Sequence, residues 1–241
     1  MISVCLTSFN GEKYIEEQIR SILIQLDCDD ELIVSDDSST DNTLEVVKSI
    51  KDKRIVLYEN MKFKHYTPNF GFAISKAKGD YIFLSDQDDV WLPTKVNVMV
   101  NHLKCNDLVV SDCFVVDQDL NVIQNSFYNG NYNRSGFFKN FVHNHFLGCT
   151  LAFRRSLIFV ILPFPKNILS HESWIGLNAE VFGKTLFIND RLILYRRHAN
   201  NYSNTLKGST LTFYQKLKYR FYILINILFT KFKLMLWKAK I

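Results

Sequence analysis

The fold is decided by residues 2–42, which read ISVCLTSFNGEKYIEEQIRSILIQLDCDDELIVSDDSSTDN. Short apolar, β-branched runs at 2–7 and 31–36 predict two strands. Between these runs, apolar residues from Tyr14 to Leu26 recur at helical spacing and predict a helix. A strand, a helix and a second strand in this order are typical of a parallel pair joined by a crossover.

The same alternation continues along the chain. Three further strand-like runs lie at 54–59, 80–86 and 107–113, and a short helix pattern follows Asp41, a candidate cap. We therefore predict an α/β fold with a mainly parallel, twisted sheet flanked by helices. In such sheets ligands bind beyond the carboxyl ends of the strands, where this chain carries TSFNG, SDDSSTDN and SDQDDVW.

The second half of the sequence is less regular. Residues 127–146 are rich in glycine, asparagine and aromatic side chains and give no clear period. GCTLAFRR at 148–155 predicts a strand, and HESWIGLNAEVFGK at 171–184 predicts a helix. One or two more strands are expected within 187–198.

Composition places the chain among ordinary globular proteins. Of its 241 residues, 47% are hydrophobic and 22% charged, enough for a core that needs no metal or disulfide to hold it. Five cysteines without a CxxC pair predict reduced thiols rather than a disulfide framework or a zinc site. Because Met1 leads directly into a strand pattern without a signal-like segment, we expect a cytoplasmic protein.

Charge is unevenly distributed along the chain. Residues 1–190 hold all 24 acidic residues and 18 Lys and Arg, for a net charge of −6, whereas the last 51 residues carry +11. This split predicts an acidic cleft with a basic tail and argues against a uniformly basic nucleic-acid binder. Motifs for P-loop or dinucleotide sites, GxxxxGK and GxGxxG, do not occur.

The acidic strand ends are the strongest chemical signal. In an extended SDQDD segment, Asp86 and Asp88 point the same way, as two carboxylates that bind one Mg2+ or Mn2+ must. Asp36 and Asp37 end another strand and can accept hydrogen bonds from a ribose or a base. The alternative for Asp86 and Asp88 is a solvated acidic turn or a helix N-terminus, whereas Asp36 can simply bond the turn backbone and Asp41 can cap the following helix. Together the pairs would repel a diphosphate unless a divalent cation bridged them.

Two later segments add a candidate base and candidate cations. Glu172 opens the helix at 171–184, where it is either a general base or a favourable partner of the helix dipole. Arg196 and His198 lie in YRRHANN, which also holds Asn200 and Asn201. This cationic segment either neutralises a diphosphate leaving group or forms a basic surface patch.

Taken in order, these motifs resemble those of family 2 glycosyltransferases with the GT-A fold. The resemblance runs from residue 2 to about residue 201 and includes SVCLTSFNG, ELIVSDDSSTDNT, NFGFAISKAKGDYIFLSDQDDVW, LGCTLAFRRSL, HESWIGLNAEVFGK and YRRHANN. Within the family, SDQDDVW and YRRHANN look most like bacterial rhamnosyltransferase-like enzymes of O-antigen, lipopolysaccharide and capsule synthesis. The resemblance implies a Rossmann-like nucleotide-sugar-binding half at 1–113, an acceptor half at 114–204, and a separate tail at 205–241.

The resemblance also implies a role for each matching residue. The positions implied for the donor nucleotide are Thr7, Phe9, Asp36, Asp37 and Asp86. Asp86 and Asp88 match the metal-binding DxD motif, with His198 as a further ligand, and Arg196 and His198 match positions near the diphosphate. Glu172 matches the catalytic base, although the family usually has Asp there, and Arg197 stands where a neutral residue is common.

The function implied is metal-dependent, inverting sugar transfer. The donor would be dTDP-rhamnose or a UDP-hexose, and the acceptor a hydroxyl of a growing, lipid-linked cell-surface polysaccharide. One carboxylate deprotonates that hydroxyl for in-line displacement. Two alternatives stay open: a haloacid-dehalogenase-type phosphatase with Asp86 as nucleophile, because DQDDV fits DxDx[TV], and a non-catalytic sugar-binding protein.

The tail has its own pattern. Residues 207–241 carry eight Lys or Arg and no acid, and an apolar stripe runs at helical spacing through Phe213, Leu217, Phe221, Leu224, Leu228, Phe232 and Met235. Ile223 and Ile227 lie off this stripe. The longest uncharged run is ten residues, too short to span a bilayer. We expect either a helix packed on the body or peripheral attachment to the inner leaflet of the membrane.

Overall fold

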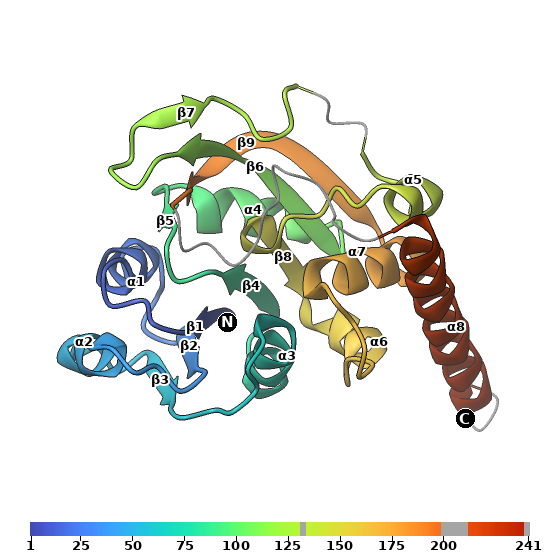
Figure 1. Ribbon diagram of the computed structural model, residues 1–241, viewed down its shortest axis with the longest axis horizontal. Coiled ribbons are helices and arrows are strands. Elements are labelled where there is room, and N and C mark those ends of the chain that lie inside the picture. The colour runs from blue at the N-terminus through green and yellow to red at the C-terminus, as the bar shows by residue number, and fades with distance from the viewer. Residues whose placement is uncertain (131–133, 199–211, 239–241) are drawn as a thin grey trace.

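The computed structural model describes residues 1–130, 134–198 and 212–238 and centres on one curled sheet flanked by helices (Figure 1). The strands are β1 (Ile2–Ser8), β2 (Glu31–Asp36), β3 (Ile55–Tyr58), β4 (Tyr81–Ser85), β5 (Val90–Trp91), β6 (Leu108–Val116), β7 (Val122–Gln124), β8 (Leu151–Arg154) and β9 (Thr185–Arg196). The helices are α1 (Ile15–Leu23), α2 (Thr43–Ser49), α3 (Tyr66–Lys76), α4 (Lys95–Leu103), α5 (Phe137–Val142), α6 (Ile158–Ile161), α7 (His171–Phe182) and α8 (Phe213–Lys238), with 3-10 turns η1 (Gly148–Thr150) and η2 (Arg155–Leu157).

The sheet confirms the predicted α/β architecture. Its strand order is β3-β2-β1-β4-β8-β6-β9-β5, with β7 added at β6. The first four strands in this order pair in parallel, β8 runs antiparallel between β4 and β6, and β6 pairs in parallel with β9. The carboxyl ends of β1, β2 and β4 therefore meet at one edge of the sheet.

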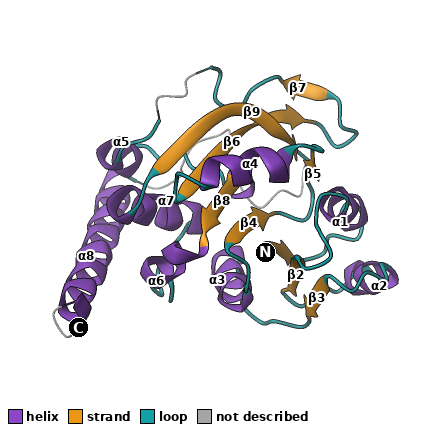
Figure 2. Cartoon of the chain, turned by 180° about the vertical axis from the view of Figure 1, so that it is seen from behind, coloured by secondary structure: helices purple, strands orange, loops and turns teal. Residues whose placement is uncertain are grey.

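Helices cover both faces of the sheet, as the view from behind also shows (Figure 2). On one face, Val4 and Leu6 pack in a buried cluster with Ile15 and Ile19 of α1 and Met99 of α4. On the other face, the alternate strand residues Cys5, Ile33 and Ile82 pack with Phe70 of α3 and Trp174 of α7. The period-2 alternation along the buried strands divides the core into these two layers.

Most predicted elements occur, with several differences in the second half. The strand expected at 148–155 begins as the η1 turn, and the segment at 187–198 belongs to one long strand, β9. The irregular stretch at 127–146 contains the short helix α5. The division into halves at residue 113 stays a prediction, because one sheet runs through both parts.

The tail forms the long helix α8, which leaves the body beyond α5 and α7 (Figure 1). No helix in the described part of the chain is long and apolar enough to cross a membrane. Residues 199–211, which include Asn200, Asn201 and the predicted boundary at 204, lie outside the described residues.

Candidate active site

A cavity of about 670 Å³ opens at the carboxyl ends of β1, β2 and β4. The predicted residues Thr7, Phe9, Asp37, Asp86, Asp88 and Glu172 line it. These side chains come from four strand and helix ends that lie far apart in the sequence. The cavity therefore joins the predicted donor half to the predicted acceptor half.

The acidic loop after β4, residues 86–89, is fixed by hydrogen bonds to α1 and to the loop after β1. Gln18 of α1 donates to the Ser85 hydroxyl at 2.6 Å and to the Asp86 carbonyl at 3.2 Å. Gln87, between the two acidic residues, accepts from the Phe9 amide at 2.8 Å and donates to the Phe9 carbonyl at 3.0 Å. The loops after β1 and β4 are thus fixed to each other by the residue in the middle of the DxD motif.

The charges of this loop fit a divalent cation. Burial raises the pKa of Asp86 well above its ordinary value, and the negative charges of Asp89, Asp88 and Glu172 raise it further. Asp86 and Asp88 both line the cavity with carboxylate oxygens, which are the donors that Mg2+ and Mn2+ prefer. A cation held here would relieve the repulsion among these carboxylates.

His198 and Arg196 approach the same loop from β9. The Nε2 atom of His198 lies 2.9 Å from Oδ2 of Asp88, and its ring packs on Tyr14. Arg196 is buried: Nε donates to the Asp88 carbonyl at 2.7 Å, NH1 donates to the Gln118 carbonyl at 2.7 Å, and the guanidinium pairs with Glu17. Neither side chain lines the cavity, and both contact the acidic loop from behind.

The two acidic residues after β2 differ in their surroundings. Asp36 is fully buried, and its carboxylate accepts from the Ser8 hydroxyl at 2.9 Å and the Ser39 amide at 2.9 Å. Asp37 lines the cavity, while its Oδ1 accepts from the Phe63 amide at 2.6 Å. Asp37 therefore presents a carboxylate to the cavity, and Asp36 holds the turn that positions it.

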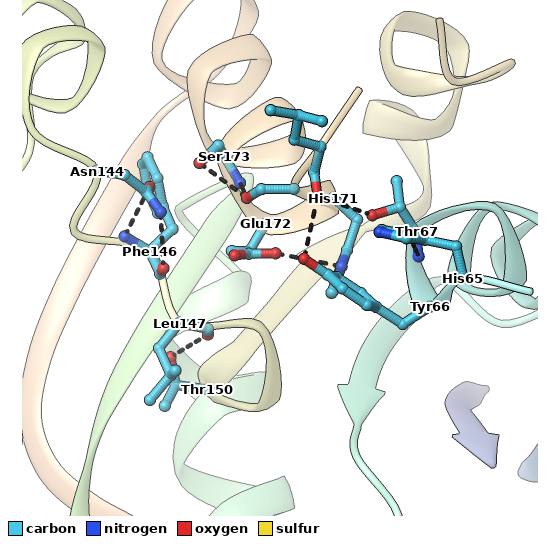
Figure 3. A network of polar contacts seen from close by, with 12 residues as sticks. His65, Tyr66, Thr67, Asn144, Phe146, Leu147, Thr150, His171, Glu172 and Ser173 are labelled. Carbon is cyan, nitrogen blue, oxygen red and sulfur yellow. Dashed lines mark hydrogen bonds and ion pairs between the residues drawn. The ribbon is translucent and has the colours of Figure 1, made fainter. Parts of the chain in front are cut away.

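Glu172 stands in the first turn of α7, where Ser170 caps the helix by accepting from the Ser173 amide at 3.2 Å. Its carboxylate points away from the helix toward the cavity, beside His171 and Tyr66 (Figure 3). Burial raises the pKa of Glu172. A buried carboxylate with a raised pKa, facing a cavity, has the properties of a general base.

His171 fills the space beneath this carboxylate. Its Nδ1 lies 3.2 Å from Oε2 of Glu172, but burial lowers the pKa of His171 to about 3, so the ring is neutral and the contact is no ion pair. The ring stacks on Phe70 with centroids 4.1 Å apart. A Cβ atom at Gly148 would lie 2.8 Å from Nε2 of His171, so only glycine allows the η1 turn to approach this closely.

A buried lysine connects the acidic loop to the η1 turn. Lys95 is fully buried at the start of α4, and its Nζ donates to the Cys149 carbonyl at 2.9 Å. Burial raises the pKa of Asp89 to about 7, and the charge of Lys95 opposes that rise. Asp89 also accepts from the Arg196 amide at 3.0 Å. Lys95 thus supplies an internal positive charge beside the acidic loop.

We expect Lys95→Met to change the pH dependence of stability. Burial lowers the pKa of Lys95 to about 8, against about 10.4 in an unfolded chain. Between these values the unfolded state binds the extra proton, so the free energy of unfolding rises with pH by at most about 1.4 kcal/mol per unit. Burial raises the pKa of the Cys5, Cys113 and Cys149 thiols, so these groups lower the stability of both proteins as pH rises through the same range. Denaturant unfolding at several pH values should therefore show the Lys95 contribution as a difference in unfolding free energy, wild type minus Lys95→Met, that increases with pH.

The exposed lysine just beyond the same helix provides the control for this experiment. Lys104→Met should keep the wild-type pH profile, because the Lys104 side chain is exposed and its amine bonds only the neighbouring Asn101 in the part of the chain that the structure describes. Parallel profiles for Lys95→Met and the wild type would contradict the assignment.

The cavity also contains residues that the sequence did not single out. The segment before and within α3 contributes Lys62, Lys64, His65, Tyr66 and Asn69. Tyr66 donates to the Leu169 carbonyl at 3.0 Å, which ties α3 to the start of α7 (Figure 3). NFGFAISK marks part of this helix, but no residue in it has a spacing that predicts a ligand.

Comparisons with known proteins agree with this geometry. The family model described as glycosyl transferase family 2 matches residues 3–160. The dTDP-rhamnosyl transferase RfbG of Shigella flexneri is 29% identical, over 88% of this chain and 77% of its own length. WfaP of Escherichia coli, a UDP-Glc:alpha-D-GlcNAc-diphosphoundecaprenol beta-1,3-glucosyltransferase, is 32% identical over 46% of this chain and 44% of its own length. The match therefore spans less than half of WfaP.

A solved structure shares the fold. The mannosyltransferase PcManGT from Pyrobaculum calidifontis, in complex with GDP-Man and Mn2+, superposes with a TM-score of 0.64 at 20% identity. The match covers 83% of this chain and 58% of that chain. The likeness confirms the fold expected from the sequence motifs.

Proposed function

Because this chain belongs to glycosyl transferase family 2 and has the GT-A fold, we propose that it moves a sugar from a nucleoside-diphosphate sugar to an acceptor hydroxyl. The observation that carries the proposal is the single cavity onto which Asp86, Asp88 and Glu172 converge. This convergence supports the proposal, because a metal-bound diphosphate and a base would both have to lie in one cavity. The alternative of a haloacid-dehalogenase-type phosphatase is excluded, because the chain belongs to a different family.

The donor is held, in this proposal, by residues from the first half. Thr7, Phe9 and Asp37 contact the nucleoside, with Asp36 fixing the turn behind Asp37. Asp86 and Asp88 would hold Mg2+ or Mn2+, which when bound would offset the charge of the diphosphate, and His198 would orient Asp88 or join it as a ligand. Arg196 acts on the diphosphate through the loop that it holds, since its guanidinium bonds the Asp88 carbonyl.

The base is Glu172. It takes the proton of the acceptor hydroxyl as the oxygen attacks the anomeric carbon from the side opposite the diphosphate. A single displacement inverts the configuration, and no carboxylate nucleophile is needed. The side chain of Glu is one methylene longer than the Asp usual in the family, which would shift the placement of the acceptor.

The substrates follow from the relatives' names. We propose dTDP-rhamnose or a UDP-hexose as donor, because RfbG is a dTDP-rhamnosyl transferase and WfaP uses UDP-Glc. We propose a lipid-linked oligosaccharide as acceptor, as the diphosphoundecaprenol in the name of WfaP suggests. Such an acceptor would place the enzyme at the cytoplasmic face of the inner membrane, attached peripherally by its basic tail and engaged in cell-surface polysaccharide synthesis.

Direct assay tests the proposal. Incubation with each sugar nucleotide, Mn2+ and a lipid-linked acceptor should give a glycosylated product whose new linkage has the opposite anomeric configuration to the donor. Binding of donors without transfer or hydrolysis would instead support the sugar-binding protein. Transfer that persists unchanged in excess chelator would contradict the metal dependence.

A further inference from the structure

Within the described residues, helix α8 packs on the body along one side. Ile223 and Ile227 are buried, with 3% and 2% of their surface exposed, and Tyr219 and Leu234 pack beside them on the second core cluster. The Tyr219 hydroxyl accepts from the Leu169 amide at 3.2 Å, and burial raises the pKa of Tyr219 to about 12. These four residues follow one another at intervals of four, four and seven, so they form one docked side.

The docked side is not the stripe that the sequence predicts. Phe221, Leu228 and Phe232 of that stripe remain 63%, 55% and 57% exposed. The exposed side of α8 forms a continuous apolar face made of Phe213, Tyr214, Leu217, Phe221, Ile225, Leu228, Phe229, Phe232, Met235 and Leu236. Monomeric proteins seldom expose large apolar side chains in such a row.

Positive charges border this apolar face. At 100° per residue, Arg220 and Lys231 lie along one edge of it and Lys233 lies beyond the other edge, where Lys218 falls within the margin of the face. Lys216 lies on the docked side. The helix contains no Asp or Glu at all. Long basic side chains flanking an apolar stripe can extend toward headgroups while the stripe enters the acyl region.

The short helix α5 contacts α8 and exposes apolar side chains of its own. The Arg220 guanidinium of α8 donates to the Val142 carbonyl of α5. Phe138 and Val142, one turn apart on α5, are 81% and 59% exposed. An element that α8 contacts therefore also exposes apolar side chains.

We propose that the apolar face of α8 docks on a bilayer of anionic phospholipid. Charge complementarity selects this occupant: an anionic leaflet attracts every charged residue on the helix, whereas a second copy of the chain would bring lysines against lysines. The helix lies in the interface rather than crossing it. This inference makes the proposed peripheral location specific, and it rests on the surface of α8 rather than on the donor or the reaction.

Vesicle flotation of the full chain tests the surface. We expect binding to phosphatidylcholine vesicles that contain about 30% phosphatidylglycerol, little binding to phosphatidylcholine alone, and release by high salt. The combined variant Phe221→Gln, Leu228→Gln and Phe232→Gln should weaken binding by about tenfold or more. Its thermal stability should stay near that of the wild type, because all three side chains are exposed.

An exposed phenylalanine elsewhere provides the control. Phe159→Gln on α6, where the side chain is 81% exposed, should leave flotation unchanged. Equal flotation of the triple variant and the wild type, or no flotation of the wild type, would overturn the proposal. Self-association that the triple variant abolishes, without vesicle binding, would assign the face to a second copy. Sugar transfer to a soluble acceptor should survive in the triple variant, which separates this test from the test of the reaction.

Discussion

Replacing Asp88 by Asn should reduce sugar transfer at least about 100-fold, because a divalent cation contributes several kcal/mol to a charged transition state. Asn keeps the size of the side chain and its contact with His198, whose Nε2 lies 2.9 Å from Oδ2 of Asp88. It removes the negative charge that a cation needs. The expected loss therefore comes from metal binding and leaves the fold intact.

Metal-dependent stability provides the sharper readout of Asp88→Asn. Without metal, the variant should melt at or above the wild-type temperature, because the charge of Asp88 raises the pKa of both Asp86 and Asp89 and so opposes their ionisation. With Mn2+, the wild type should gain thermal stability by mass action and the variant should not. Asp119→Asn, at an exposed carboxylate beyond the end of β6, is the control for both measurements. Near-normal transfer with an unchanged Mn2+ response would contradict the metal site.

The first half of the fold is predictable because its strands are buried on both faces. Residues 31–36 read as a strand from their apolar run, and β2 has the same bounds in the structure. The segment of α4 is harder, since VNVMVN alternates like a strand. In the folded protein Val96, Met99 and Leu103 are buried instead at helical spacing, because α4 packs on the sheet. Tertiary packing decides such a segment, and local pattern does not.

The candidate site is predictable where its residues directly follow the carboxyl end of a strand. It is less predictable where a side chain near a strand end points away from the cavity. Asp86 and Asp88 reach the cavity as expected from their spacing. Arg196 leaves β9 at a similar edge, but its guanidinium is bound behind the loop by Glu17 and the Asp88 carbonyl. The sequence contains no signal for this, since the partners are separated by more than a hundred residues.

The C-terminal tail is also predictable only in part, because its secondary structure follows from the sequence but its docked side does not. Periodicity correctly predicts a helix there, and α8 forms over Phe213–Lys238. Which side docks depends on the shape of the body, where Ile223 and Ile227 fit and the predicted stripe does not. A helix that is apolar on two sides has no internal feature that tells them apart.

Replacing Glu172 by Gln should reduce transfer by roughly 10²- to 10⁴-fold while donor binding persists, because the amide keeps the shape of the side chain but cannot accept the acceptor's proton. The donor contacts proposed for Phe9 and Asp37 remain, and the loss of the Glu172 charge favours the ionised form of Asp86. Turnover with a lipid-linked acceptor and calorimetric titration with the donor measure the two effects separately. Glu180→Gln, two turns along the same helix, is the matched control, since Glu180 bonds the Gly136 amide and does not line the cavity.

The pH profile then distinguishes a base from a residue that only shapes the cavity. Glu172 accepts a proton only when ionised, and burial raises its pKa above the ordinary glutamate value of about 4.3. As pH falls, kcat/KM of the wild type should therefore begin to decline at a higher pH than it would if the base were an exposed glutamate. The residual activity of Glu172→Gln should lack that decline, because the amide does not titrate. An unchanged acid limb in Glu172→Gln would assign the titration to another group, and a product with the donor's own anomeric configuration would contradict single displacement.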